Sequence, residues 1–185
     1  MSLNSPESAV QEAMRLVESN ANSNIRLSAN GGNCILIVCE PFREFAYIEA
    51  IKHLMTNDKY EIIDLNNVLC EFVTANKPYL EDSFELLKGS IHQIFRTPHG
   101  EEGPDLFGLI EQAITSSLQD GKIPVLIRSG ALYGSGIENI HIMENDMIMK
   151  AVLPLIILYP ATREKDKLMF LSSRPASKYR CLIID

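Results

Sequence analysis

The apolar residues of this chain gather in six short runs that are typical of strands buried within a sheet. Continuous apolar runs bounded by Gly, Pro or polar residues indicate strands that are covered on both faces. The predicted strands are Cys34–Cys39, Tyr60–Leu65, Pro124–Arg128, Leu155–Tyr159, Leu168–Leu171 and Tyr179–Ile184. We expect the last two to form a hairpin-like extension, because residues 172–177 between them are too few for a helix.

Between these runs, apolar residues recur at the spacing of amphipathic helices. Ser5 followed by Pro6 is typical of an N-cap with proline at the first helical position. Further helices are predicted over the stripe Phe45, Ile48, Ile51 and Leu54, over 68–73, over the stripe from Leu80 to Phe95, from Pro104 to Leu118 with a stop at Gly121, and over 137–150. Residues 20–33 are rich in Asn, Ser and Gly and are predicted to be a linker, and residues 97–104 a loop.

Strands that alternate with helices predict an α/β fold with a mostly parallel sheet and helices on both of its faces. We expect an N-terminal helix and linker over residues 1–33 and a single α/β domain over residues 34–185. Ligands of such sheets bind outside the carboxyl ends of the strands. The loops predicted to lie there are 40–43, 64–67, 128–130 and 159–163.

Composition places limits on the partners and on the compartment. The chain has 185 residues, 46% of them hydrophobic, and a formal net charge of −7. The acidic balance argues against binding to nucleic acid or to an anionic membrane. No run is long enough to span a bilayer, and the N-terminus lacks the pattern of a signal peptide. The four cysteines form no Cys-x-x-Cys pair, so we expect reduced cysteines and a cytoplasmic protein.

The common catalytic and cofactor motifs are incomplete. The single Gly-Lys pair, Gly121-Lys122, precedes a strand, so a phosphate-binding P-loop is not expected. The run Gly134-Ser-Gly136-Ile-Glu-Asn139 matches a dinucleotide fingerprint only in part, and a tight turn explains its glycines equally well. Ser129 lacks the flanking glycines of a nucleophile elbow. The four histidines are scattered singly. The sequence therefore predicts no catalytic residue, metal or cofactor.

Arginines and tyrosines near the predicted strand ends are the remaining candidates for function. Arg128, Arg163, Arg174 and Arg180 could hold an anion, or could pair with Glu138, Glu144 or Glu164. The three tyrosines there could line a partner surface or pack with the hydroxyl at the rim. The candidates for ligand or partner binding are Arg128, Ser129, Gly130, Tyr133, Gly134, Gly136, Tyr159, Arg163, Tyr179 and Arg180.

Three short motifs carry a resemblance to a known family. Ser129-Gly-Ala-Leu-Tyr133, the strand Leu155-Ile-Ile-Leu-Tyr-Pro160 and the segment Lys178-Tyr-Arg-Cys-Leu-Ile183 resemble the BrxB family of bacterial BREX bacteriophage-exclusion systems, with a looser likeness at 34–41 and at 64–65. The chain departs from the family pattern at Ala161, where glycine is usual. It also departs at 134–137, where a proline and then an arginine are usual, and in its single Tyr179.

The resemblance implies an α/β fold of P-loop-NTPase-like or Rossmann-like topology without a P-loop. It also implies an accessory or scaffold protein without established catalytic residues, which docks larger defence proteins such as an ATPase or a DNA methyltransferase. The alternative function is a domain that binds a nucleotide or another anion with its 129–136 loop. Either a true member of the family or a divergent relative would fit these residues.

Overall fold

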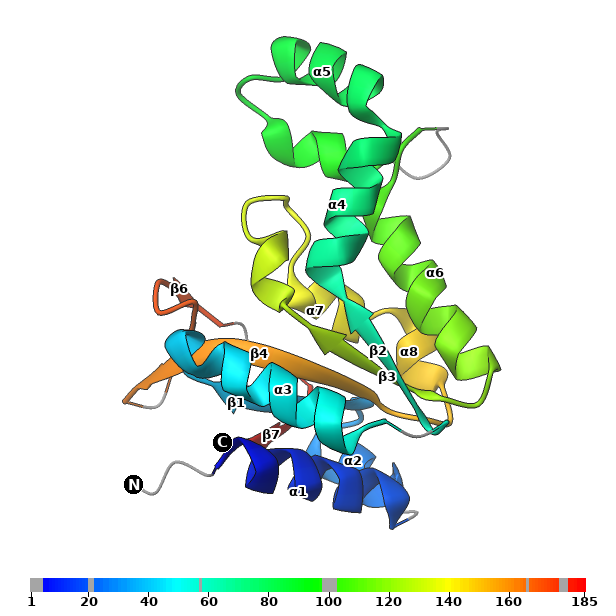
Figure 1. Cartoon of the computed structure of the whole chain (residues 1–185), viewed down its shortest axis with the longest axis vertical. Coiled ribbons are helices and arrows are strands. Elements are labelled where there is room, and N and C mark those ends of the chain that lie inside the picture. The colour runs from blue at the N-terminus through cyan, green and yellow to red at the C-terminus, as the bar shows by residue number, and fades with distance from the viewer. Residues whose placement is uncertain (1–4, 20–21, 57, 98–102, 166, 177–179) are drawn as a thin grey trace.

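The computed structural model describes residues 5–19, 22–56, 58–97, 103–165, 167–176 and 180–185, and it is an α/β protein built on one central sheet (Figure 1). The strands are β1 Cys34–Cys39, β2 Tyr60–Asp64, β3 Ile123–Ile127, β4 Leu155–Glu164, β5 Lys167–Phe170, β6 Arg174–Pro175 and β7 Leu182–Ile184. The α-helices are α1 Pro6–Glu18, α2 Asn22–Ser28, α3 Glu44–Leu54, α4 Leu65–Ala75, α5 Lys77–Leu86, α6 Leu106–Gln119, α7 Asn139–Met143 and α8 Asp146–Lys150. Three short 3-10 helices are η1 Pro41–Arg43, η2 Ile91–Phe95 and η3 Ser129–Leu132.

Five parallel strands form the main sheet in the order β2-β3-β4-β1-β7. The expected fold class is therefore confirmed. Numbering these five strands 1 to 5 along the chain gives the order 2-3-4-1-5, which differs from the Rossmann order 3-2-1-4-5-6.

The two faces of the sheet carry separate hydrophobic clusters. Alternate residues of the fully buried β1 point to opposite faces, so that Leu36 belongs to one cluster and Ile37 to the other. Helices α1 and α3 cover the face of Ile37, and α4, α6, α7 and α8 cover the face of Leu36. This division follows from right-handed crossovers, because the chain moves one way across the sheet from β1 to β2 and returns from β2 to β4.

The N-terminal helix is docked on the domain. Ser5 accepts a hydrogen bond from the Ser8 amide and caps α1 as expected, and the helix buries Val10 and Ala13 against α3 and β1. The predicted linker over 20–33 is wrong in part, because residues 22–28 form α2. The Asn33 side chain is fully buried and its amide donates to the carbonyls of Ile148, Ala151 and Leu153, which ties this segment to the start of β4.

The middle helices are more broken than the apolar spacing predicts. The stripe from Leu80 to Phe95 divides into α5 and η2, and the helix predicted over 137–150 divides into α7 and α8. Asn145 causes the second break, because its side chain accepts a hydrogen bond from the Met147 amide and begins a new helix. The helix predicted from Pro104 begins at Leu106.

The C-terminal region also differs from the expected hairpin. Strand β5 pairs antiparallel with the second half of β4 and with the two-residue β6. Strand β7 does not pair with β5; it joins the main sheet parallel to β1. Residues 159–163, expected as a loop after a strand, lie within β4.

Candidate functional site

The parallel strands bring three of the four expected loops to one edge of the sheet. η1 follows β1, α4 follows β2, and η3 follows β3, each at the carboxyl end of its strand. This is the edge where parallel sheets bind their ligands. Strand β4 continues past the edge to Glu164 and pairs there with β5.

Arg128 and Ser129 shape the turn that follows β3. Arg128 adopts a left-handed conformation, with φ 57° and ψ 42°, and its Nη1 atom donates to Oδ2 of Asp64 at 2.7 Å. A non-glycine residue in this region is strained and needs support from its surroundings. Ser129 is fully buried, and its hydroxyl donates to the Leu158 carbonyl at 3.0 Å. Ser129 therefore fastens η3 to β4 and is not presented to solvent as a nucleophile.

Two carboxylates flank Arg128 at this edge. Asp64 pairs with it directly and also caps α4 by accepting hydrogen bonds from the Asn66 and Asn67 amides. Burial raises the pKa of Glu44; the nearby Arg128 opposes this rise and Asp64 adds to it. The Oε1 atom of Glu44 is buried and has no hydrogen-bond partner among the described residues. The charge of Arg128 is thus already compensated.

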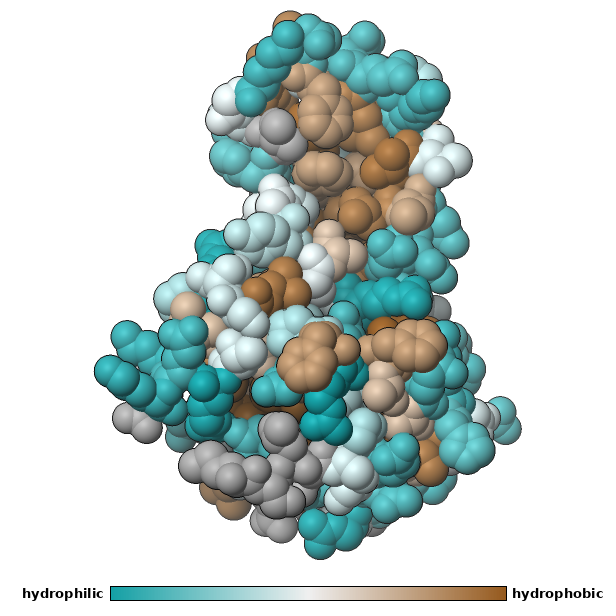
Figure 2. Space-filling model, turned by 60° about the vertical axis from the view of Figure 1, so that its left-hand side comes forward, coloured by the Kyte–Doolittle hydropathy of each residue, from teal (hydrophilic) through white to brown (hydrophobic). Residues whose placement is uncertain are grey.

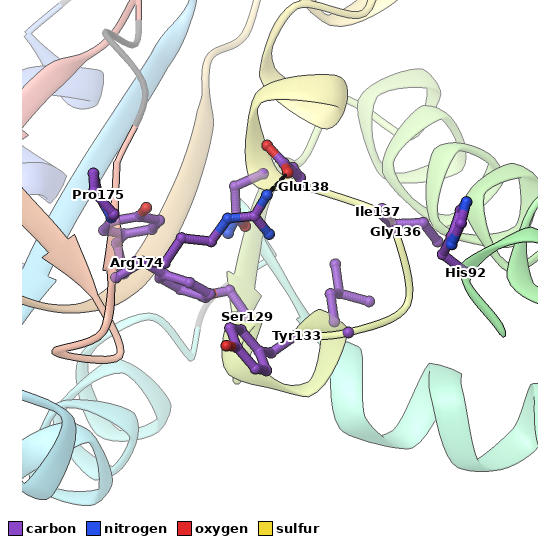
Figure 3. A pocket seen from close by; sticks show the side chains of 13 residues that line it. His92, Ser129, Tyr133, Gly136, Ile137, Glu138, Arg174 and Pro175 are labelled. Atoms are coloured by element: carbon purple, nitrogen blue, oxygen red, sulfur yellow. Dashed lines mark hydrogen bonds and ion pairs between the residues drawn. The ribbon is translucent and has the colours of Figure 1, made fainter. Parts of the chain in front are cut away.

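A pocket of about 240 Å³ opens beside η3, between the end of β3, the middle of β4 and the β5–β6 hairpin (Figure 3). Five of the predicted residues line it: Ser129, Tyr133, Gly134, Gly136 and Tyr159. The sequence did not identify the other lining residues as one site; these are His92, Leu132, Ile137, Glu138, Asn139, Phe170, Arg174 and Pro175. They come from segments that are distant in sequence, so no local motif joins them.

The pocket walls combine aromatic, apolar and polar groups. The rings of Tyr159 and Phe170 stack with centroids 4.9 Å apart. Arg174 reaches from the hairpin to form an ion pair with Glu138, as Figure 3 shows. This is one of the pairings that the sequence left open.

The glycines of the pocket loop have structural roles. Gly134 and Gly136 have positive φ values of 88° and 78°. A Cβ atom on Gly136 would lie 2.7 Å from the Cβ of His92, so only glycine lets η2 approach this loop so closely. Both glycines are explained by the turn and by this packing, which was the alternative to a dinucleotide fingerprint.

The other predicted residues do not line this pocket. A Cβ atom added to Gly130 would meet the side chains of Leu171 and Pro160, and Arg163 pairs with Asp185. Arg180 is exposed, and its carbonyl lies so close to Gly32 that a Cβ there would be 1.8 Å away. Tyr179 lies outside the described residues.

Exposed aromatic residues gather at the same edge of the sheet. Phe42 in η1 and Phe45 at the start of α3 are 81% and 69% exposed, and Tyr133 after η3 is 56% exposed. We call these three residues the aromatic edge. The sequence placed Phe45 on the buried stripe of its helix, which is wrong, because the buried face of α3 is formed by Tyr47, Ile48, Ala50 and Ile51. The sequence signal for an exposed turn here was the Pro41-Phe42 pair directly after β1, because proline is typical of turns.

A second apolar surface lies on the segment that projects from the sheet, residues 65–95 (Figures 1 and 2). Figure 2 shows apolar side chains along this projection. Its large, exposed apolar side chains on α4 and α5 are Val73, Tyr79, Phe84 and Leu86. The exposed apolar side chains on α4 and α5 are not part of the pocket lining.

The cysteines are free thiols, and three of them are buried. Burial raises the pKa of Cys34, and it raises the pKa of Cys39 and of Cys181 to about 12. These thiols therefore stay protonated near neutral pH and are poor nucleophiles. Within the described parts of the chain, no three His, Cys, Asp or Glu side chains are grouped to hold a metal ion. No described helix is both long and apolar enough to cross a membrane.

The fold and the site together define an α/β protein with a parallel sheet, a small pocket and exposed aromatic rings at the carboxyl edge of its strands. Comparisons with family models, with curated proteins and with solved structures find no match to this chain. The function must therefore be argued from the geometry.

Proposed function

We propose that this protein is a non-catalytic accessory or scaffold component of a bacterial phage-defence assembly of the BREX type, and that it acts through protein–protein contacts. The aromatic edge is the observation that carries the docking role. The defence context and the partners, an ATPase or a DNA methyltransferase, rest on the resemblance of the 129–133, 155–160 and 178–183 motifs to the BrxB family. Free cysteines agree with a cytoplasmic location.

The aromatic edge supports docking because grouped exposed apolar side chains mark interaction sites and aromatic residues are frequent at binding hot spots. Its three residues come from the segments after β1 and β3, so the parallel sheet holds them at one edge. The Arg128–Asp64 pair connects the ends of β3 and β2 beside them. Such a preorganised surface binds with a smaller entropy cost than a flexible one.

The alternative function, binding of a nucleotide or another anion, has less support from the charges. Arg128 pairs with Asp64, Arg163 with Asp185, and Arg174 with Glu138. A phosphate would have to compete with a carboxylate for each of these guanidinium groups. Arg180 is exposed but is not among the residues that line the pocket.

The test is affinity capture of the tagged full chain from its native host, followed by binding measurements with the purified partner. We expect an ATPase or a DNA methyltransferase encoded in the same defence locus. A Phe42→Ser/Phe45→Ser double variant should bind that partner at least about thirtyfold more weakly, since two hot-spot side chains are lost.

The control is Val152→Ser, which removes an equally exposed apolar side chain just before β4, at the opposite edge of the sheet. It should bind like the wild type. Recovery of neither an ATPase nor a methyltransferase would argue against the defence role. Equal binding by the double variant would argue against the aromatic edge as the docking surface.

A further inference from the structure

The pocket beside η3 has a lining suited to a small and uncharged ligand. Its volume of about 240 Å³ lies below the range of pockets for drug-sized ligands, which favours a ligand no larger than a base or a nucleoside. Leu132, Ile137, Tyr159 and Phe170 are buried residues of its lining and provide apolar and aromatic walls. The ion pair of Arg174 with Glu138 cancels the two formal charges of the lining.

Asn139 is a buried polar residue of this pocket whose side-chain oxygen has no partner among the described residues. It is only 4% exposed, it lines the pocket, and its Oδ1 atom has no hydrogen-bond partner among the described residues. An unpaired polar atom that is shielded from water is costly, so it indicates a place where a ligand donor is missing. The terminal torsion of an Asn side chain is soft, and the amide can therefore turn to meet a ligand in the pocket that Asn139 lines.

An amide side chain recognises one kind of flat molecule especially well. Its oxygen accepts from an amino group while its nitrogen donates to an adjacent ring nitrogen, as Asn does with adenine. Tyr133, half exposed at the pocket rim, offers a ring on which such a base can stack. Glu138 is the N-cap residue of α7 and lies beside Asn139; its carboxylate accepts from Arg174 and from the helix backbone and has further lone pairs that can accept from ribose hydroxyls.

We propose that this pocket binds an uncharged aminopurine base or nucleoside of the adenine type. Asn139 reads the amino group and the adjacent ring nitrogen, Tyr133 stacks on the base, and Glu138 accepts from the ribose. Tyr133 belongs both to this pocket and to the aromatic edge, but the proposal does not depend on the docking role, because the small molecule binds to the isolated chain. The pocket also differs from an anion site, because no phosphate is required.

The first experiment compares three ligands on the purified full chain by calorimetry and by thermal unfolding. Adenosine should bind and raise the melting temperature, since a ligand of the folded state stabilises it. Inosine, which has a carbonyl in place of the amino group, should bind about tenfold more weakly or worse. AMP should bind no better than adenosine. This comparison needs no variant and so does not depend on folding.

The second experiment changes the pocket. Tyr133→Ala should weaken adenosine binding at least about fivefold through the loss of stacking, and Tyr79→Ala, an exposed tyrosine on the distant α5, should not. Asn139→Leu should abolish binding if the variant folds. The proposal is overturned if adenosine does not bind at millimolar concentration, if inosine binds equally well, or if AMP binds while adenosine does not.

Discussion

Gly32 lies where the segment before β1 passes the backbone of Arg180. A Cβ atom there would be 1.8 Å from the Arg180 carbonyl oxygen, and backbone atoms cannot move aside as the end of a side chain can. We expect Gly32→Ala to lower the free energy of unfolding by about 3 kcal/mol, at the upper end of the cost of overpacking. Urea denaturation measures this directly.

Gly89, in the turn after α5, is the matched control. It has no positive φ, and a Cβ atom added to it would have no other atom within 4 Å, so Gly89→Ala should leave stability unchanged or raise it slightly. Equal stability of the two alanine variants would show that the approach of Arg180 to Gly32 is not tight in solution.

Glu44 provides a pH-dependent prediction at the same scale. Its pKa is raised by burial, so the folded protein holds this proton at pH values where the unfolded chain has already lost it. The stability that this carboxyl contributes is therefore full below its unfolded pKa, about 4.3, and is lost as the pH rises through the raised folded value. Glu44→Gln should match the wild type near pH 4 and become the more stable protein as the pH rises.

Urea titrations at several pH values test the Glu44 prediction, with Glu49→Gln as the control. Glu49 is an exposed carboxylate on the same helix, and its replacement should change stability little at any pH. If the wild type instead gains stability over Glu44→Gln as the pH rises, attraction to Arg128 outweighs the cost of burial.

Single residues were predictable from the sequence where a local rule governs them. Ser5 caps its helix as expected. The sequence left two options for Tyr159, and the fold stacks its buried ring on Phe170 in the pocket wall. Asn139, Phe170 and His92 were not identified, because their place in the pocket depends on the arrangement of α7, β5 and η2 in space. Pairing of Arg174 with Glu138 was one of several options, and only the fold selects it.

At the scale of elements, α1 is part of the core. Val10 is fully buried between this helix and the sheet face shared with α3. Val10→Asp would bury an unpaired carboxylate, and we expect it to cost at least about 3 kcal/mol in the free energy of unfolding. Gln11→Asp, at the exposed neighbouring position, should cost little. A small loss for Val10→Asp would mean that α1 detaches without unfolding the sheet.

The same scale shows why some predicted elements were wrong. Apolar periodicity predicted one helix from 137 to 150, but the Asn145 cap divides it, since a local side-chain hydrogen bond competes with the helix. The polar composition of 20–33 predicted a linker, although Arg26 and Asn33 donate hydrogen bonds to the carbonyls before β4. Composition alone does not reveal such tertiary partners.

For the whole molecule, alternation of strands and helices was enough to predict a parallel sheet with two covered faces. Strand order was not predictable in this way, because β7 joins β1 from the other end of the chain, with Leu182 opposite Ile35. The pairing of β5 with the far half of β4 likewise separates β7 from its expected hairpin partner. Long-range pairing of this kind has no local signal in the sequence.

The distribution of buried residues over the molecule predicts unequal local stability. All six residues of β1 are buried, and the strand lies in the interior of the sheet between β4 and β7, whereas α5, on the projection, buries only Leu80 and Ser83. Regions with few buried contacts open at a lower free energy than the core. In hydrogen exchange under native conditions, amides of β1 and β4 should exchange only through global unfolding, and those of α5 should exchange through local opening. If the exchange rates of α5 and β1 amides had the same dependence on urea concentration, the projection would unfold together with the sheet. If the exchange rates of α5 amides depended less on urea than those of β1, the projection would open separately and would be the part of the protein that is free to adapt to a partner.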